Sequence, residues 1–472
     1  MNAEKQNKME VMPMGRLVFS MAFPMMISML VQAFYNVVDS LFVSHIASTA
    51  LLTNASDKAV QALTLAFPIQ MLMIACNAGT GVGISAVLSR YLGQKNRDAA
   101  SRVAGNGIFL AGIIYLLFLL FGLFGAKAFI LTQTTDMETA QMSISYLRIC
   151  TICAFGTMGY FAYEKILQAT GMTTLAMIAQ LAGALVNILL DPVFIFGWFG
   201  IPALGVAGAA IATVLGQCFS LLIGMIVYYR FNHQIDHGLR FCRPDLELIR
   251  QIYQIGFPAI VMNAMTSIMA YGMNLLLGSV STAYVTAFGI YYKLQNFIYM
   301  PVFGLNNALV PITGFSYGAR SRSRIRQSLR WGLTDAMVIM GIGILLMQCF
   351  ASQIVSCFSV SGETQTIGIS ALRIISSGYL FAGINIILQG YCQALGNGVY
   401  SLVISLLRMA VVLLPLVWLL LTSGHAEGVW LAFPMAEFTA LVAAVCMARH
   451  LNRVRSIELT AAPTQSGQAA QA

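Results

Sequence analysis

Long apolar runs follow one another along almost the whole chain, and they leave few folds open to it. Hydrophobic residues make up 58% of the sequence and charged residues only 9%, whereas a soluble domain carries about 25% charged residues. A run of roughly 20 apolar residues crosses a bilayer as a helix, and the period-2 alternation of an outer-membrane barrel is absent. We therefore predict an all-α polytopic membrane protein with twelve spans. They cover residues 15–44, 58–88, 101–125, 136–168, 173–197, 205–229, 249–278, 282–314, 325–350, 363–391, 398–421 and 427–449.

Basic residues gather in alternate loops of this pattern. Arg and Lys are frequent before the first span and after the second, sixth, eighth and twelfth, while the opposite side carries only Lys58 and Lys127. Because basic loops stay on the cytoplasmic side, we expect both termini in the cytoplasm and the chain in the cell inner (plasma) membrane. The topology also accounts for the net charge of +9 without nucleic acid as a partner. The first apolar run is too long for a signal peptide.

The two halves of the chain resemble each other. Each would hold six spans, so both halves cross the membrane in the same direction and form a parallel pseudo-twofold repeat, an architecture suited to alternating access. The matching segments are Ala22-Phe23-Pro24 with Gly256-Phe257-Pro258, Leu147-Arg148-Ile149 with Leu372-Arg373-Ile374, Gln168-Ala-Thr-Gly171 with Gln393-Ala-Leu-Gly396, and Gly205-Val206 with Gly428-Val429.

This repeat predicts two six-helix lobes. The boundaries are a cytoplasmic tail at 1–14, an N-terminal lobe at 15–229, a cytoplasmic loop at 230–248, a C-terminal lobe at 249–450 and a disordered cytoplasmic tail at 451–472.

Carboxylates inside the predicted spans are the main candidates for chemistry. Asp39, Glu164 and Asp191 lie in spans of the first half, and Asn187 lies one helical turn before Asp191 on the same face. An acid in hydrocarbon is costly unless it faces a cavity, a proton or a cation, and clustering around a shared proton or cation lowers that cost. The alternative is a structural partner for a basic or backbone group. That alternative stays open for Glu164, which precedes Lys165, and it is favoured for acids near span ends. Those acids are Asp335 and Glu437.

The second half contains the matching segments of the repeat but has no acid at the positions that correspond to Asp39 and Asp191. The position matching Asp39 falls near Asn274, and Pro415 lies where Asp191 would fall. Lys293 is either a substrate gate or a buried structural cation. Five residues are candidates for a substrate cavity: Tyr35, Asn36, Asn274, Lys293 and Gln295.

Several motifs that could suggest an enzyme have simpler explanations. Cys150 and Cys153 form a C-x-x-C inside an apolar span, where cysteine acts as a small apolar residue. The run Gly79-Thr-Gly-Val-Gly83 follows no strand and is better explained by close helix packing. There is no candidate catalytic triad and no histidine in the middle of a span. We predict that the chain is not an enzyme and needs no cofactor beyond a coupling ion.

The chain resembles the multidrug and toxin extrusion (MATE) transporters, most closely their DinF-like branch. The resemblance is carried by Phe23-Pro24, Tyr35-Asn-Val-Val-Asp39, Ser89-Arg-Tyr-Leu-Gly93, Asn187-Ile-Leu-Leu-Asp191-Pro192 and Gly205-Val-Ala-Gly208. It implies twelve helices in two lobes that form a V. It also implies a cation site in the first lobe at Asp39, Asn187 and Asp191, with Glu164 in the place of a polar residue of the fourth span and Thr213 contributing. Gln168 replaces the more usual arginine and receives no role.

These observations predict an antiporter that exports amphipathic, cationic drugs or toxins by alternating access, coupled to H⁺ or Na⁺. A sodium ion would bind at Asp39, Asn187 and Asp191, since carboxylate and amide oxygens suit a hard cation. The expected partners are a small-molecule substrate and the lipid bilayer, and the expected state is a monomer. One alternative is a flippase or exporter of a lipid-linked or metabolite substrate on the same two-lobe plan. A polytopic membrane enzyme or receptor is a more distant one.

Overall fold

The computed structural model describes residues 7–44, 55–200, 202–358, 360 and 362–460, and in this part of the chain the ordered elements are helices, with no strand. The first half contains α1 (Lys8–Val11), α2 (Met14–Ser44), α3 (Ala55–Gly93), α4 (Arg97–Leu120), α5 (Ala126–Leu131), α6 (Met137–Ile152), α7 (Phe155–Ala169), α8 (Thr173–Phe196) and α9 (Val206–Phe231). The second half contains α10 (Leu246–Gly278), α11 (Thr282–Gly318), α12 (Arg322–Ser356), α13 (Glu363–Ser376), α14 (Tyr379–Ala394), α15 (Gly398–Leu406), α16 (Leu413–Thr422) and α17 (Ala432–Thr460).

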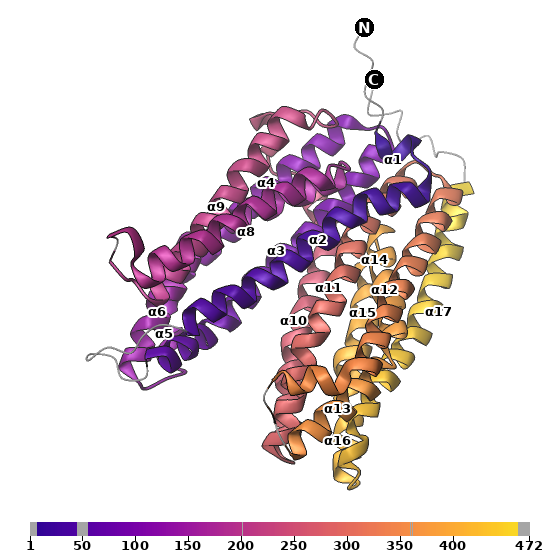
Figure 1. Ribbon diagram of the computed structural model, residues 1–472. Helices are drawn as coiled ribbons and strands as arrows, with labels where there is room; N and C mark the ends of the chain where they lie inside the picture. Colours follow the sequence, from indigo (N-terminus) through magenta and orange to yellow (C-terminus); the bar gives the residue numbers. More distant parts are fainter. Residues whose placement is uncertain (1–6, 45–54, 201, 359, 361, 461–472) are drawn as a thin grey trace.

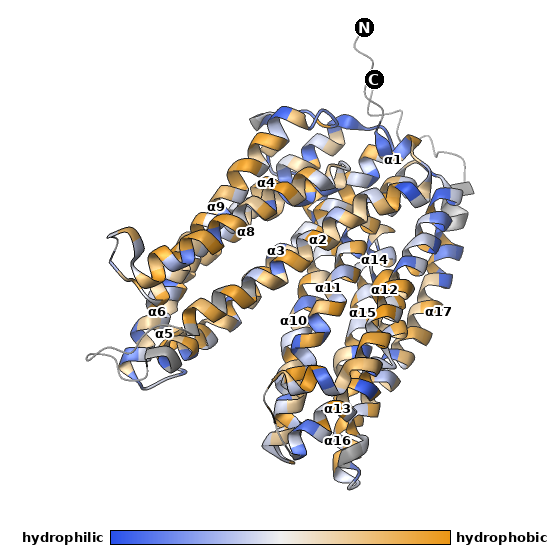
Figure 2. Cartoon of the chain, viewed as in Figure 1, coloured by the Kyte–Doolittle hydropathy of each residue, from blue (hydrophilic) through white to orange (hydrophobic). Residues whose placement is uncertain are grey.

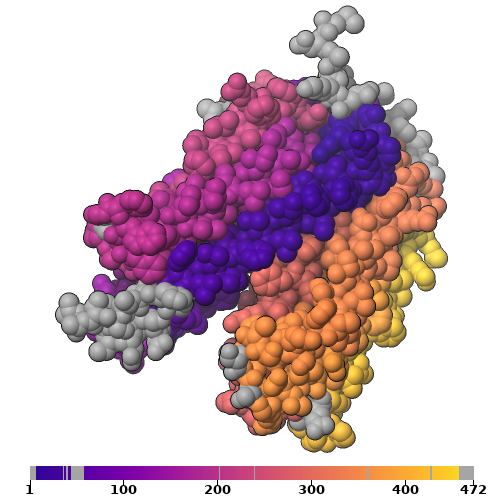
Figure 3. All heavy atoms as spheres, viewed as in Figure 1, coloured from indigo at the N-terminus to yellow at the C-terminus, as the bar shows by residue number. Residues whose placement is uncertain are grey.

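The helices form two lobes arranged as a V (Figure 1). Helices α2–α9 make one lobe and α10–α17 the other, as the sequence repeat predicted. The lobes converge at the end of the molecule that carries both termini and diverge at the other end, where a notch separates them (Figure 3). Hydrophobic residues predominate along the helices, and hydrophilic ones gather at the end where the termini lie (Figure 2).

All twelve predicted spans are helical, although three of them are not single helices that are long and apolar enough to cross a membrane. In the described residues, nine helices are long and apolar enough to cross a membrane, and the pair α13 and α14, bent by 50°, makes a tenth. The span predicted at 136–168 is α6 and α7, which are separated at Cys153 and Ala154. The span predicted at 282–314 is α11, whose amide side chains lower its hydropathy. Polar groups and breaks are tolerated at membrane depth where they face protein or a water-filled cavity.

Glycines hold the lobes together at the closed end. A Cβ added at Gly79 or Gly83 of α3 would clash with the backbone of α10, and one at Gly304 of α11 would clash with the backbone of α2. Small residues at such positions let helices pack at backbone distance. The prediction that the Gly79–Gly83 run serves close packing is confirmed, and the structure adds that the helices it joins belong to different lobes.

The short helix α1 lies across this closed end and contacts both lobes. Glu10 pairs with Lys95 of the first lobe at 2.9 Å. Arg324 of α12 donates hydrogen bonds to the carbonyl oxygens of Met9 and Met12 at 2.6 and 3.2 Å. The Met9 side chain is fully buried. The N-terminal segment therefore adds polar and apolar contacts that join the lobes.

Both predicted ends of the C-terminal lobe differ from the helix ends. Helix α10 begins at Leu246, slightly before residue 249. Helix α17 continues through Thr460, so the first part of the predicted C-terminal tail is helical rather than disordered. Residues 461–472 lie outside the described part of the chain.

Candidate functional site

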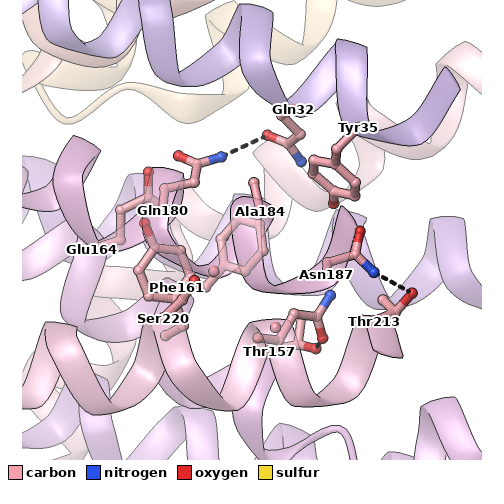
Figure 4. A pocket seen from close by; sticks show the side chains of 14 residues that line it. Gln32, Tyr35, Thr157, Phe161, Glu164, Gln180, Ala184, Asn187, Thr213 and Ser220 are labelled. Atoms are coloured by element: carbon pink, nitrogen blue, oxygen red, sulfur yellow. Dashed lines mark hydrogen bonds between the residues drawn. The ribbon is translucent and has the colours of Figure 1, made fainter. Parts of the chain in front are cut away.

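A pocket lies inside the first lobe, enclosed by α2, α7, α8 and α9 (Figure 4). Its volume is about 510 Å³, counted with the open space at its mouth. Its described lining residues are rich in amides and hydroxyls, and they include one acid, Glu164, and no basic side chain. The residues that line it are Gln32, Tyr35, Thr157, Tyr160, Phe161, Glu164, Gln180, Gly183, Ala184, Asn187, Thr213, Gly216, Gln217 and Ser220.

Asn187 connects this pocket to the buried carboxylate of Asp191. Both residues lie on α8, one turn apart, and are 4% and 0% exposed. Asn187 Nδ2 lies 3.4 Å from Asp191 Oδ1 and 3.4 Å from Thr213 Oγ1 of α9. Asn187 Oδ1 is buried and accepts no hydrogen bond from the residues that the structure describes. The amide therefore places one free acceptor beside a carboxylate and a hydroxyl, the oxygen chemistry that hard cations bind.

Close packing of α8 on α9 brings these groups together. A Cβ at Gly183 would clash with Ser220 Oγ and lie 2.5 Å from the carbonyl oxygen of Gly216. A Cβ at Gly216 would lie 2.9 Å from Asn187 Cβ. The two glycines thus let the helices approach until Asn187 and Thr213 meet. Pro192 comes directly after Asp191 in α8, and it lacks the backbone N–H that would continue the hydrogen-bond pattern of the helix.

Glu164 enters the same pocket from α7 and is 3% exposed. Gln168 Nε2 donates a hydrogen bond of 2.7 Å to Glu164 Oε1. Lys165 Nζ donates to Gln168 Oε1 at 3.0 Å and to Asn307 Oδ1 of α11, in the second lobe, at 3.3 Å. Gln168, which received no role from the sequence, therefore links the pocket acid to a buried lysine at the lobe interface. Glu164 therefore faces the pocket and has Gln168 as a polar partner, and its role in coupling stays a prediction.

Asp39 and Asn36 lie within α2, but their side chains are outside the described residues. The predicted sodium site at Asp39, Asn187 and Asp191 is therefore traced through Asn187 and Asp191 alone. In the described residues there is no group of three or more His, Cys, Asp or Glu side chains that could hold a metal. Tyr35, the third candidate on α2, lines the pocket.

Several amide side chains at this pocket were not predicted from the sequence. Gln180 Nε2 donates to Gln32 Oε1 at 3.4 Å, and Ser28 donates to Gln180 Oε1. Thr157 on α7 donates to Gln217 on α9. They could have been identified from the sequence, because amide residues inside the apolar spans of the first half are as unusual as Asn274 and Gln295 in the second half.

The second-lobe candidates do not line this pocket. Asn274 of α10 and Lys293 of α11 are exposed, and Gln295 is half-buried. The exposure of Lys293 contradicts its interpretation as a buried structural cation. The sequence grouped these three residues with Tyr35 as candidates for one substrate cavity, whereas the structure places Tyr35 in the first-lobe pocket and the other three outside it.

The second lobe holds a buried ion pair of its own. Arg408 Nε and one terminal nitrogen donate to Glu437 Oε1 at 2.9 and 2.6 Å. Asn385 Nδ2 donates to Glu437 Oε2 at 2.8 Å. Arg408 lies in a π-helical segment, Leu407–Val411, between α15 and α16. Glu437 is thus a structural partner for a basic residue, as its position near a span end favoured.

A protein-family model described as MatE matches residues 24–193 and 258–419, one match in each half of the chain and together well over half of it. The multidrug export protein MepA of Staphylococcus saprophyticus is 23% identical over 431 residues, which cover 91% of this chain and 92% of MepA. The probable multidrug resistance protein YoeA of Bacillus subtilis is 27% identical over 389 residues, or 81% of this chain and 84% of YoeA.

The fold has close counterparts among solved structures. One, described as the outward-facing conformation of a multidrug resistance MATE family transporter of the MOP superfamily, superposes with a TM-score of 0.88. It is 24% identical and covers 97% of this chain and 100% of its own. The two-lobe arrangement of twelve helices is therefore shared with that protein.

Proposed function

The chain belongs to the MatE family of membrane transporters, and on that basis we propose that it exports amphipathic, cationic drugs or toxins in exchange for H⁺ or Na⁺. Relatives that match more than 80% of its length are named for multidrug export or resistance. The observation that carries the proposal is the first-lobe pocket, which is lined by the carboxyl group of Glu164 and by Asn187, whose amide lies beside the Asp191 carboxylate. No basic side chain is among its described lining residues, so the pocket suits a cation rather than an anion.

We place the coupling cation at the point where Asn187 contacts Asp191 and Thr213, and we keep Asp39 and Glu164 as further candidates for this site. A proton would neutralise a carboxylate there, whereas a sodium ion would take carboxylate, amide and hydroxyl oxygens. Either ion drives transport only through a difference in its affinity for the two states of the transporter. Export requires the ion-bound state to favour release of substrate on the far side.

The two-lobe plan supports alternating access as the transport mechanism. The lobes touch at the end that carries the termini and separate at the other end, so a rocking motion of one lobe against the other would open the space between them to each side in turn. With both termini in the cytoplasm of a plasma-membrane protein, the open end of the V faces outward. We propose that the transporter works as a monomer without a further cofactor and belongs to the DinF-like branch.

A lipid-linked or anionic metabolite would call for a basic central cavity. Three basic residues in spans of the second half could supply it: Lys293, Arg373 and Arg408. Arg408 is now neutralised by Glu437, and Lys293 and Arg373 are exposed residues outside the described pocket. We therefore favour a cationic substrate.

The test is transport by the full chain reconstituted in liposomes, with ethidium as substrate and proton and sodium gradients imposed separately. We expect Asp191→Asn and Asp39→Asn to reduce gradient-driven efflux at least about tenfold. Asp98→Asn is the matched control, because Asp98 forms a surface pair with Arg102. Unchanged efflux in both Asp191→Asn and Asp39→Asn would remove the coupling role, and the gradient that supports efflux identifies the ion.

A further inference from the structure

Two consecutive residues of α7 face different parts of the molecule. The Glu164 side chain lines the first-lobe pocket. Lys165, the next residue, reaches the contact between the lobes, where its Nζ donates a hydrogen bond of 3.3 Å to Asn307 Oδ1 of α11. Successive side chains of an α-helix point about 100° apart, so one helix serves both faces. Helix α7 therefore joins the candidate coupling site to the lobe interface.

A glycine of α3 makes room for the Lys165 side chain. A Cβ added at Gly81 would lie 2.6 Å from Lys165 Cγ and 3.3 Å from its Cδ, so the aliphatic stem occupies the space that a larger residue would fill. Gly79 and Gly83, two residues to either side, pack against α10 of the other lobe. Lys165 is only 4% exposed, and its ammonium group therefore lies buried where the lobes touch.

This ammonium group has no direct ion pair in the part of the chain that the structure describes. Its acceptors there are two neutral amide oxygens, Gln168 Oε1 at 3.0 Å and Asn307 Oδ1. A buried charge without a countercharge is strongly unfavourable. The Glu164 carboxylate supplies the countercharge through one intervening amide, because Gln168 Nε2 donates to Glu164 Oε1 at 2.7 Å.

The Gln168 amide is oriented by both charges. Its N–H faces the carboxylate and its carbonyl oxygen faces the ammonium, so each hydrogen bond strengthens the other. A cation that neutralises Glu164 removes the attraction that favours a buried lysine. Lys165 regains water when the lobes separate at this end, and neutralisation of Glu164 therefore favours that separation.

We propose that Lys165 is a positioning residue that transmits the charge of the pocket to the lobe interface. With Glu164 ionised, Lys165 stays on Asn307 and the lobes stay closed at this end. With Glu164 neutralised, the lysine becomes hydrated and the lobes open there. The inference rests on the proposed cation-coupled transport, and it names the contact that gives the cation a different affinity for the two states.

The test measures spin-label distances in the cysteine-free full chain, with labels at the exposed positions Gln94 and Gln327, one in each lobe. No substrate or ion gradient is applied. Glu164→Gln imitates the neutralised acid, and it should raise the ratio of open to closed molecules at this end at least about tenfold, because an interaction with a buried charge is lost. Lys165→Met should stay closed, and so should the double variant, since no buried charge remains to be hydrated.

This result separates a charge relay from a simple tether. If Lys165 only fastened the lobes together, Lys165→Met would open this end. Opening in Lys165→Met, or an equal effect of Glu164→Gln with and without the lysine, therefore overturns the proposal. Lys127→Met, at an exposed lysine of α5, is the matched control and should give the distances of the parent protein.

A charge rescue tests the relay without replacing the lysine. Asn307→Asp keeps the shape of the side chain and gives Lys165 a carboxylate acceptor in the second lobe. Combined with Glu164→Gln, it should return the open fraction to that of the parent protein, because a direct ion pair replaces the lost countercharge. An open fraction as high as that of Glu164→Gln alone would contradict the relay.

Ethidium efflux by the wild-type chain in liposomes tests the transport function separately, since the distances are measured without ethidium. Efflux together with additive distance effects would leave the proposed function in place and remove Lys165 from coupling. Absence of efflux would count against the proposed function, whereas non-additive distances would still support the link between Glu164 and Lys165.

Discussion

At the scale of single residues, the pocket depends on polar side chains that partner one another out of water. Asn187 touches both Asp191 and Thr213, and Gln168 lies between Glu164 and Lys165. A buried polar group without a partner costs about 1–3 kcal/mol. Asn187 and Gln168 therefore lower the cost of burying the charged side chains that they contact inside the lobe.

Replacing Gln168 tests this directly. Gln168→Ala removes the donor to Glu164 and the acceptor of Lys165, so we expect a loss of about 1–3 kcal/mol in stability. The measurement is the thermal unfolding of the purified transporter. Gln353→Ala, at an exposed glutamine of α12, should leave the unfolding temperature unchanged, and equal effects of the two substitutions would argue against the bridging role.

The ion pair of the second lobe invites a double-mutant cycle. Arg408→Met alone leaves the Glu437 carboxylate without its cation, which costs about 3–5 kcal/mol for a buried pair. Arg408→Met with Glu437→Leu should recover much of that loss, since no uncompensated charge remains. Thermal unfolding and ethidium efflux are both measured. A double variant that is stable and yet inactive would show that the pair also acts in transport.

At the scale of helices, the approach of α8 to α9 positions the cation cluster. Gly183→Ala places a methyl group against Ser220 Oγ and the carbonyl of Gly216, so the helices must separate at the level of Asn187 and Thr213. We expect ethidium efflux to fall about tenfold or more while the protein still inserts in the membrane.

The control is Gly112→Ala, because none of the described residues has an atom within 4 Å of the added Cβ there. Alanine also favours a helix by about 1 kcal/mol relative to glycine. Efflux should stay at the wild-type level in this variant. If Gly183→Ala transports as well as Gly112→Ala, tight packing of α8 on α9 is not needed for the site.

Helix boundaries show where sequence patterns are informative. The twelve apolar runs predicted the helices because burial in lipid demands about 20 apolar residues and internally satisfied backbone groups. The break between α6 and α7, the 50° bend between α13 and α14 and the π-helical segment at Arg408 were not predicted. Such irregularities depend on neighbouring helices that accept or replace the lost backbone hydrogen bonds.

At the scale of the whole molecule, the two lobes meet through glycine-lined contacts at one end only. Gly83→Ala should weaken the contact of α3 with α10, since the added Cβ would clash with the Ile252 carbonyl. We expect the population to shift away from the state closed at this end. Spin-label distances between the lobes, in a cysteine-free background, would report the shift.

Gly341→Ala serves as the comparison, because its added Cβ would lie more than 4 Å from the neighbouring atoms that the structure describes. Its distance distribution should match that of the parent protein. An unchanged distribution in Gly83→Ala would mean that the α3–α10 contact does not set the balance between the two states.

The sequence by itself determined the membrane class, the two-lobe repeat and most of the first-lobe candidates. It did so because hydrocarbon penalises charge so strongly that each acid in a span stands out, and because a duplication leaves matching segments such as Phe23-Pro24 and Phe257-Pro258. Asn187 and Asp191 could be paired from helical spacing alone, four residues apart.

Only the tertiary structure decided which distant residues meet. Thr213 reaches Asn187 because glycines on α8 and α9 let two backbones approach, and Gln168 joins Glu164 to a lysine that contacts the other lobe. The separation of Asn274 and Lys293 from the pocket depends equally on packing. Contacts between residues far apart in the chain are set by helix rotation and crossing, which local spacing does not record.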